Sequence, residues 1–169
     1  MDVTGALDRV HTVVATPVGD LTLVRAGSAL AGVYFPAHKP APAVGRLGLG
    51  SSEGFEEITT QLSEYFAGDR RRFELTLDPV GTEFQQSVWA ALRTIPYGET
   101  WTYSDLARAI GRPTSVRAVA SANARNPLSI VVPCHRVIGM SGSLTGFAGG
   151  VERKRLLLDL ESGSPTLFG

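Results

Sequence analysis

The chain has 169 residues, of which 43% are hydrophobic and 19% charged, and 16 basic side chains balance 16 acidic ones. This composition is that of an ordinary globular protein with one medium domain or two small ones. The single cysteine, Cys134, excludes an internal disulfide and a cysteine-rich zinc site, and a free thiol fits a reducing compartment. No apolar run approaches the length of a membrane span, so a cytoplasmic protein that does not contact membranes is expected.

The N-terminal part reads as a small antiparallel meander combined with one helix. Apolar residues at helical spacing predict a helix from Phe55 to Phe66, which Gly68 ends. The segment from Pro36 to Ser52 is rich in Pro, Gly and Ala and predicts a loop. His11 and His38 stand alone and have no partners at metal-ligand spacing. Strands are predicted over residues 12–16, 21–25, 30–35 and 72–78.

The C-terminal part reads as mostly helical. Residues 78–81 look like a linker, which divides the chain into expected domains at 1–78 and 79–169. Thr82 and Gln85 have the spacing of a capping box. The predicted fold class is α+β, with a small antiparallel sheet and helix followed by a helical domain that contains a helix-turn-helix. Helices are expected from Thr82 to Ile95, from Ser104 to Gly111, from Pro113 to Arg125 and from Val151 to Glu161.

Charge is distributed unevenly along the chain. Residues 1–79 carry 7 basic and 10 acidic residues, whereas residues 80–169 carry 9 basic and 6 acidic ones. No Asp or Glu occurs between Leu106 and Val151. Such a window suits a polyanion such as nucleic acid, although a solvated basic face balanced elsewhere is an equal alternative. The window contains Arg108, Arg112, Arg117, Arg125 and Arg136.

The second helix of the helix-turn-helix is composed mainly of small residues. Small side chains let a helix approach DNA closely without reading its sequence, which favours shallow contact in the minor groove. Arg117 is the exception and could insert into the base stack. The alternative is a plain three-helix core with Arg117 on its surface.

The most informative stretch surrounds Cys134. A lone cysteine is most often a small buried apolar residue without chemistry. Here, however, an apolar run and Pro133 precede the sulfur, and His135 and Arg136 follow it. The positive charge is expected to lower the thiol pKa. Neighbouring residues of an extended chain point to opposite faces, so His135 can act on Cys134 only at a turn or through a bridging water, and the water is expected.

The segment Pro133–Gly139 resembles the active-site signature of the O6-alkylguanine-DNA alkyltransferases. The resemblance covers residues 80–161 closely and extends to residues 1–79 only in layout. It implies a ribonuclease H-like N-terminal layout and a winged-helix-like C-terminal domain. It also implies a monomer that repairs double-stranded DNA carrying O6-alkylguanine, in a single turnover and without a cofactor or metal. Further matching residues are Phe84, Gln85, Val88, Trp89, residues 95–100, Tyr103, residues 117–119, Asn123, Asn126, Pro127 and the segment 146–161.

The resemblance assigns expected roles residue by residue. Cys134 would accept the alkyl group, with His135 as its base through a water and Glu161 orienting His135. Asn126 would tie the helix-turn-helix to the Cys134 segment, and Tyr103 would assist departure of the guanine. The residues expected to contact the flipped base or the DNA are Tyr103, Ser115, Arg117, Ala118, Ala122, Asn123, Arg136, Val137, Phe147, Ala148, Gly149 and Lys154.

Departures from the family pattern and two rival functions remain. Phe147 and Ala148 stand where relatives commonly have tyrosine and often serine or glycine, and Trp101 stands where bacterial relatives often have arginine. One rival is a hydrolase or acyltransferase using Cys134, His135 and Glu161, which the arginine-rich window disfavours. The other is a DNA-damage-binding module without transfer, and sensors of that kind lack the cysteine. The preferred alkyl group, activity on alkylated thymine and cooperative packing on DNA stay open.

Overall fold

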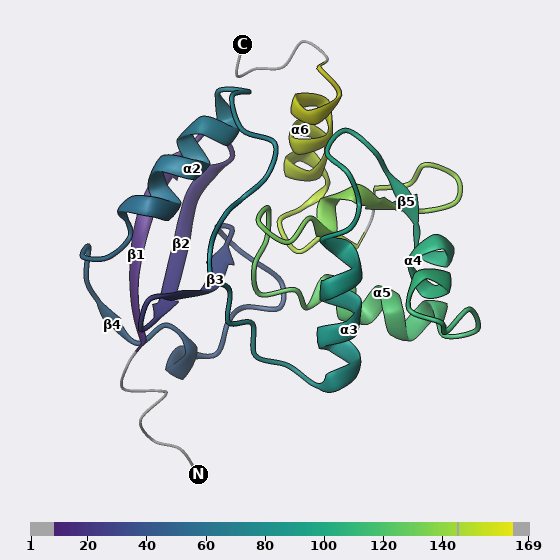
Figure 1. Ribbon diagram of the computed structural model, residues 1–169, viewed down its shortest axis with the longest axis horizontal. Coiled ribbons are helices and arrows are strands. Elements are labelled where there is room, and N and C mark those ends of the chain that lie inside the picture. Colours follow the sequence, from purple (N-terminus) through teal and green to yellow (C-terminus); the bar gives the residue numbers. More distant parts are fainter. Residues whose placement is uncertain (1–8, 145, 164–169) are drawn as a thin grey trace.

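A four-stranded sheet covered by one helix forms the N-terminal part of the computed structural model, which describes residues 9–144 and 146–163 (Figure 1). The strand order is β3-β2-β1-β4, and β1 pairs antiparallel with β2, as β2 does with β3. The predicted meander and helix are therefore confirmed. The elements are β1 (Arg9–Thr16), β2 (Gly19–Ala26), β3 (Ala29–Tyr34), β4 (Leu49–Gly50) and α2 (Glu56–Phe66).

The loop predicted between residues 36 and 52 contains more structure than expected. It includes a 3-10 turn, η1 (Val44–Arg46), and the short strand β4, which pairs in parallel with β1 through Val10 and His11. Gly48 precedes β4 with a φ of 68°, and a Cβ there would meet the backbone oxygen of Arg9. Only glycine fits this close approach, which lets a segment without strand-like composition join the sheet edge.

The prediction of a strand over residues 72–78 is wrong. The segment makes only one isolated bridge with the sheet, between Leu77 and Leu30. The reason lies in Gln61 of α2, whose side-chain amide donates to the carbonyl of Glu74 and accepts from its N–H, at 3.0 and 2.9 Å. A side chain thus takes the backbone groups that a strand partner would have used.

The C-terminal part consists of helices and one small parallel sheet. Strands β5 and β6, which the sequence did not predict, pair Trp101 with Val137 and Thr102 with Ile138. Figure 1 shows α3, α4 and α5 on the side of the molecule opposite the N-terminal sheet. The elements are α3 (Glu83–Leu92), β5 (Trp101–Thr102), α4 (Tyr103–Ala109), α5 (Val116–Ala124), η2 (Cys134–Arg136), β6 (Val137–Ile138) and α6 (Val151–Ser162).

Helix ends differ from the predicted ones where a better cap is available. The box of Thr82 and Gln85 begins α3 as predicted. Helix α4 begins after Thr102 rather than at Ser104, because Thr102 and Asp105 form a second reciprocal box. Helix α5 begins at Val116 instead of Pro113, because the chain first makes a turn in which Ser115 N–H donates to Arg112.

A continuous cluster of buried side chains joins the two parts. Leu23, Val33 and Tyr65 from the N-terminal part share it with Leu92 and Ile130 from the C-terminal part. Strand β3 also contacts the segment that leads to the cysteine, since Val33 N–H donates to the carbonyl of Pro127 at 2.8 Å. The sheet therefore supports the segment that carries the candidate nucleophile. Within the described ranges, no helix has the length and apolarity needed to cross a bilayer.

Candidate active site

Cys134 lies at the start of the 3-10 turn η2 and is 3% exposed. Its N–H donates to the carbonyl of Val132 at 2.8 Å, and Arg136 N–H donates to Pro133 at 3.0 Å. The chain is thus turned, not extended, at Cys134 and His135. Because it is turned, the two side chains need not point to opposite faces of the backbone.

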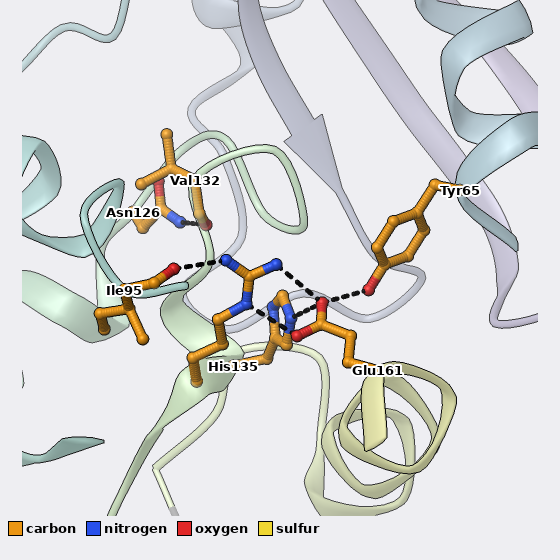
Figure 2. Close-up of polar contacts among 7 residues, drawn as sticks. Tyr65, Ile95, Asn126, Val132, His135 and Glu161 are labelled. Atoms are coloured by element: carbon orange, nitrogen blue, oxygen red, sulfur yellow. Dashed lines mark hydrogen bonds and ion pairs between the residues drawn. The ribbon is translucent and has the colours of Figure 1, made fainter. Parts of the chain in front are cut away.

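Asn126 holds the segment that delivers the cysteine. Its Nδ2 donates to the carbonyl of Val132 at 2.8 Å (Figure 2), and its Oδ1 accepts from the N–H of Leu128 at 2.9 Å. Between these anchors Ile130 has a φ of 73°, which a β-branched residue rarely adopts. The two side-chain hydrogen bonds of Asn126 therefore help to hold a strained backbone that carries Cys134.

Glu161 of α6 is the centre of a buried polar network (Figure 2). Its Oε2 lies 2.6 Å from His135 Nε2 and accepts from the Tyr65 hydroxyl at 2.6 Å. Arg136 donates through Nε to Oε1 at 2.7 Å and through Nη2 to Oε2 at 3.1 Å. Nη1 of the same guanidinium donates to the carbonyl of Ile95 at 2.7 Å. The structure thus joins His135 and Glu161, as the sequence predicted, and adds Arg136 and Tyr65 to them.

The second ring nitrogen of His135 faces a different environment. Nδ1 is buried and has no hydrogen-bond partner within the described part of the chain. Nε2 is already engaged by Glu161, so Nδ1 is the nitrogen left to exchange a proton. A buried imidazole nitrogen without a partner carries a desolvation cost, which is tolerated most readily at a functional site.

The electrostatics at the sulfur differ from those predicted. Burial raises the pKa of the Cys134 thiol, and the opposing influences of the Asn126 amide and the Lys154 ammonium do not outweigh it. Arg136 was expected to supply positive charge, but it is paired with Glu161. The charge comes instead from Lys154, which is fully buried and donates to the carbonyl of Val137. A thiol with a raised pKa needs a base to ionise it at neutral pH.

Tyr103 and the loop around Phe147 lie close to the cysteine and to each other. The pKa of Tyr103 is raised by burial and, secondarily, by the charge of Cys134. A Cβ at Gly146 would lie 3.7 Å from the Tyr103 hydroxyl. The Lys154 ammonium stands 5.7 Å from the ring centre of Phe147. The structure therefore brings Cys134, Tyr103, Phe147 and Lys154 to one place.

Contacts from the N-terminal part hold this loop. Phe35 packs edge-on against Phe147, with ring centres 5.4 Å apart, and lies so close to Gly149 that a Cβ there would overlap its ring. Lys39 N–H donates to the carbonyl of Ala148 at 3.1 Å. Arg153 bridges the parts, because its guanidinium donates to Val18 and Gly149. The loop is therefore positioned from both sides.

His38 stabilises the turn that carries these contacts. It is 6% exposed, its Nδ1 accepts from Phe35 N–H at 3.2 Å, and burial lowers its pKa to about 4. An unfolded histidine titrates near 6.5, so between these values the unfolded chain binds the extra proton and stability falls with falling pH. We expect a loss on the order of 2 kcal/mol between pH 6.5 and 4, seen as a declining melting temperature.

The variant His38→Gln keeps an acceptor but removes the titration. Its melting temperature at pH 8 sets the baseline for the substitution itself, and its decline between pH 6.5 and 4 should be shallower than that of the unmodified protein. Equal declines in the two proteins would show that His38 does not titrate in this way.

The structure divides the candidate DNA-facing residues of α5 into two groups. Arg117 and Ala118 are exposed and Ser115 is partly exposed. Ala122 and Asn123 are 3% and 2% exposed and lie on the inner face, where the carbonyl of Ala122 accepts from the Trp89 indole at 2.9 Å. Only the first group can meet a ligand without rearrangement.

The structure buries two residues that were predicted to contact DNA, and it adds to the Glu161 network one residue that the sequence did not predict. Arg136 is 7% exposed within the Glu161 network, and Val137 is fully buried in β6. Tyr65 was missed, because its spacing in α2 is that of any core aromatic. The sequence could have indicated that Lys154 and Glu161 lie on the buried face of α6, because with Leu157 they recur at helical spacing.

Two family models match the chain. The ribonuclease-like domain of 6-O-methylguanine DNA methyltransferase matches residues 10–79, and its DNA-binding domain matches residues 83–163. The methylated-DNA–protein-cysteine methyltransferase of Mycobacterium leprae is 49% identical over 86% of this chain and 88% of its own length. That of Methanosarcina acetivorans is 46% identical over 89% and 97%. The crystal structure of Mycobacterium tuberculosis OGT in complex with DNA has a TM-score of 0.86, with 44% identity over 94% of this chain and 96% of that one.

Proposed function

Since the chain belongs to the 6-O-methylguanine DNA methyltransferase family, we propose that its Cys134, His135 and Glu161 form the relay that accepts the alkyl group. The protein is a DNA-repair methyltransferase that moves an alkyl group from damaged double-stranded DNA to a cysteine of its own. Cys134 is the only cysteine in the sequence. The observation that carries the proposal is its burial beside a histidine whose Nε2 lies 2.6 Å from Glu161.

The first step is removal of the thiol proton. The raised pKa of Cys134 leaves the resting sulfur protonated, so the reaction needs a base. His135 Nδ1 is the free nitrogen of the imidazole, and a water molecule between it and the sulfur would carry the proton. Glu161 then stabilises the imidazolium through Nε2. The Lys154 ammonium and the Asn126 amide stabilise the thiolate that remains.

The second step is a substitution at the alkyl carbon. The thiolate forms a sulfur–carbon bond as the bond from that carbon to guanine O6 breaks, and the bond electrons move into the guanine ring. The Tyr103 hydroxyl, kept protonated by its raised pKa, donates a hydrogen bond to the base as charge develops. The proton lost by Cys134 ends on guanine. The thioether product has no leaving group that the site could activate, so each molecule reacts once.

The reacting carbon must first leave the base stack. The exposed face of α5 offers Arg117 and Ala118, with the partly exposed Ser115 directly before the helix, and the small residues allow close approach in the minor groove. Arg117 would fill the gap that the flipped nucleotide leaves. Phe147, Ala148 and Gly149 would close over the base, with the Phe147 ring as its stacking surface. Tyrosine in relatives adds a hydroxyl there, which Phe147 lacks.

We further assign this chemistry to residues 79–169 and a supporting role to residues 1–78. The contacts of Phe35 and Lys39 with the Phe147 loop support that division of roles. A monomer is sufficient, because every residue of the relay comes from one chain. A free, reactive thiol fits a protein that acts in the reducing cytoplasm.

The test is the intact mass of the protein after reaction with excess duplex DNA that carries one O6-methylguanine. We expect a gain of one methyl group on Cys134, reaching one per protein and then stopping, because the thioether cannot turn over. Binding without a mass change would identify a damage sensor. Absence of both would favour a cysteine hydrolase, to be checked with small ester substrates.

A further inference from the structure

One oxygen of Glu161 contacts three hydrogen-bonding groups, and the two nearest come from different parts of the molecule. Oε2 lies 2.6 Å from His135 Nε2 and accepts from the Tyr65 hydroxyl, also at 2.6 Å. His135 belongs to η2, whereas Tyr65 lies 96 positions before Glu161, on α2 of the N-terminal part (Figure 2). The carboxylate of the relay is therefore completed by a residue from outside residues 79–169.

Tyr65 is held rigidly in this position. It is fully buried, and its ring is surrounded by Phe66, Phe73 and Tyr97, with ring centres 5.2, 5.4 and 6.4 Å away. Burial and, after it, the neighbouring Glu161 charge raise the pKa of Tyr65 well above its ordinary value. The hydroxyl thus stays protonated and can serve only as a donor to the carboxylate.

The charges around His135 show what such a donor does. Glu161 is the acid in contact with the imidazole, and Arg136, which follows His135 in η2, pairs with both of its oxygens, at 2.7 Å to Oε1 and 3.1 Å to Oε2. Tyr97 and Arg71, on the segments after α3 and α2, face the network beyond Arg136, and Lys154 of α6 faces Cys134. Among the residues that the structure describes, the groups that donate to Oε2 besides His135 are the Tyr65 hydroxyl and, at 3.1 Å, Arg136 Nη2, and both weaken the attraction of Oε2 for a proton on the imidazole.

A base must be unprotonated before it can accept a proton. A buried carboxylate with its full charge on the oxygen next to Nε2 would favour the imidazolium form of His135. His135 would then already hold the proton that it has to accept from Cys134. A donor on the same oxygen withdraws part of that charge and weakens this preference. Arg136 donates one bond to each carboxylate oxygen, and its bond to Oε2 is the longer one at 3.1 Å. The Tyr65 hydroxyl, at 2.6 Å, is therefore the nearer of these two donors to the oxygen that faces Nε2.

We propose that Tyr65 is a positioning residue of the transfer reaction, which shares Glu161 Oε2 with His135 and so keeps His135 free to accept the Cys134 proton. The inference rests on the proposed function of the relay. It makes the N-terminal part a contributor to the chemistry through one hydroxyl group, in addition to its packing against the loop.

The test is Tyr65→Phe, which removes only the hydroxyl. Nuclear magnetic resonance of labelled histidine, recorded over a series of pH values, should show a larger imidazolium fraction at His135 in the variant than in the unmodified protein. Single-turnover transfer from saturating O6-methylguanine duplex should then be about threefold slower on the acid side of the pH profile and nearly equal on the alkaline plateau.

The matched control is Tyr34→Phe. Tyr34 is also a buried tyrosine of the N-terminal part, at 6% exposure, but it lies outside the Glu161 network. Its loss should leave the His135 titration where it is. A Tyr65→Phe variant that titrates like the unmodified protein, or that loses rate equally at every pH, would overturn the inference. The titration needs no DNA, so it decides the role of Tyr65 even if no methyl transfer is found, an outcome that would refute the proposed function instead.

Discussion

Replacing Cys134 with serine should reduce alkyl transfer by more than about a thousandfold. A serine hydroxyl ionises far less readily than a thiol, and an oxygen nucleophile is harder and less suited to attack at an alkyl carbon. The base and its orienting carboxylate would remain in place, since His135 and Glu161 do not depend on the sulfur for their contact. The measurement is the intact mass of the variant after incubation with excess O6-methylguanine duplex.

DNA binding by the same variant should change little. Cys134 is small and 3% exposed, so serine adds no bulk, and the exposed residues of α5 stay as they are. Affinity for alkyl-free duplex and the melting temperature provide the controls, and Cys134→Ala repeats the test without any hydroxyl. Transfer that persists in both variants would place the acceptor elsewhere and refute the assignment.

Local patterns predicted those elements whose determinants lie close together in the sequence. The capping box of Thr82 and Gln85 and the apolar spacing of α2 and α6 are of this kind. The errors arose where a distant group decided the outcome. Glu74 is not in a strand because Gln61 occupies its backbone groups, and β4 forms because Gly48 can approach the backbone of Arg9.

The candidate site likewise contains residues that a local motif predicted and residues whose positions depend on distant contacts. Cys134, His135, Asn126 and Glu161 could be proposed from a motif and its spacing, and the structure shows each of them buried in one region. Nothing in the sequence indicated that Arg136 would turn inward to Glu161. Its position depends on tertiary packing, because its guanidinium is fixed by the carbonyl of Ile95, 41 residues earlier.

The burial of Lys154 also depends on tertiary packing. Helical periodicity places it on the face of Leu157 and Glu161, but it cannot say that the whole side chain is enclosed. Burial lowers the pKa of Lys154, and the charge of Cys134 opposes that shift. The two groups therefore stabilise each other's charged forms, a coupling that a sequence motif centred on Cys134 and His135 does not contain.

Glu161→Gln should have the largest effect on stability, because it removes the negative charge from a buried network. Arg136 would be left buried without its counter-ion, which typically costs about 3–5 kcal/mol. In a protein of this size that loss lowers the melting temperature by about 10 °C. Transfer should also slow by about tenfold to a hundredfold, since the imidazolium formed at His135 would lose its stabilising partner.

The dependence on pH separates this charge effect from packing. Burial raises the pKa of Glu161, but His135 and Arg136 outweigh it and hold the pKa well below its usual range. Its stabilisation is therefore present above the unfolded value near 4.3 and is lost as pH falls through the folded value. The difference in melting temperature between the two proteins should shrink below pH 4. Glu152→Gln on the exposed face of the same helix is the matched control, and it should leave both stability and rate unchanged. Equal effects from the two substitutions would mean that the buried network contributes neither to the fold nor to the transfer.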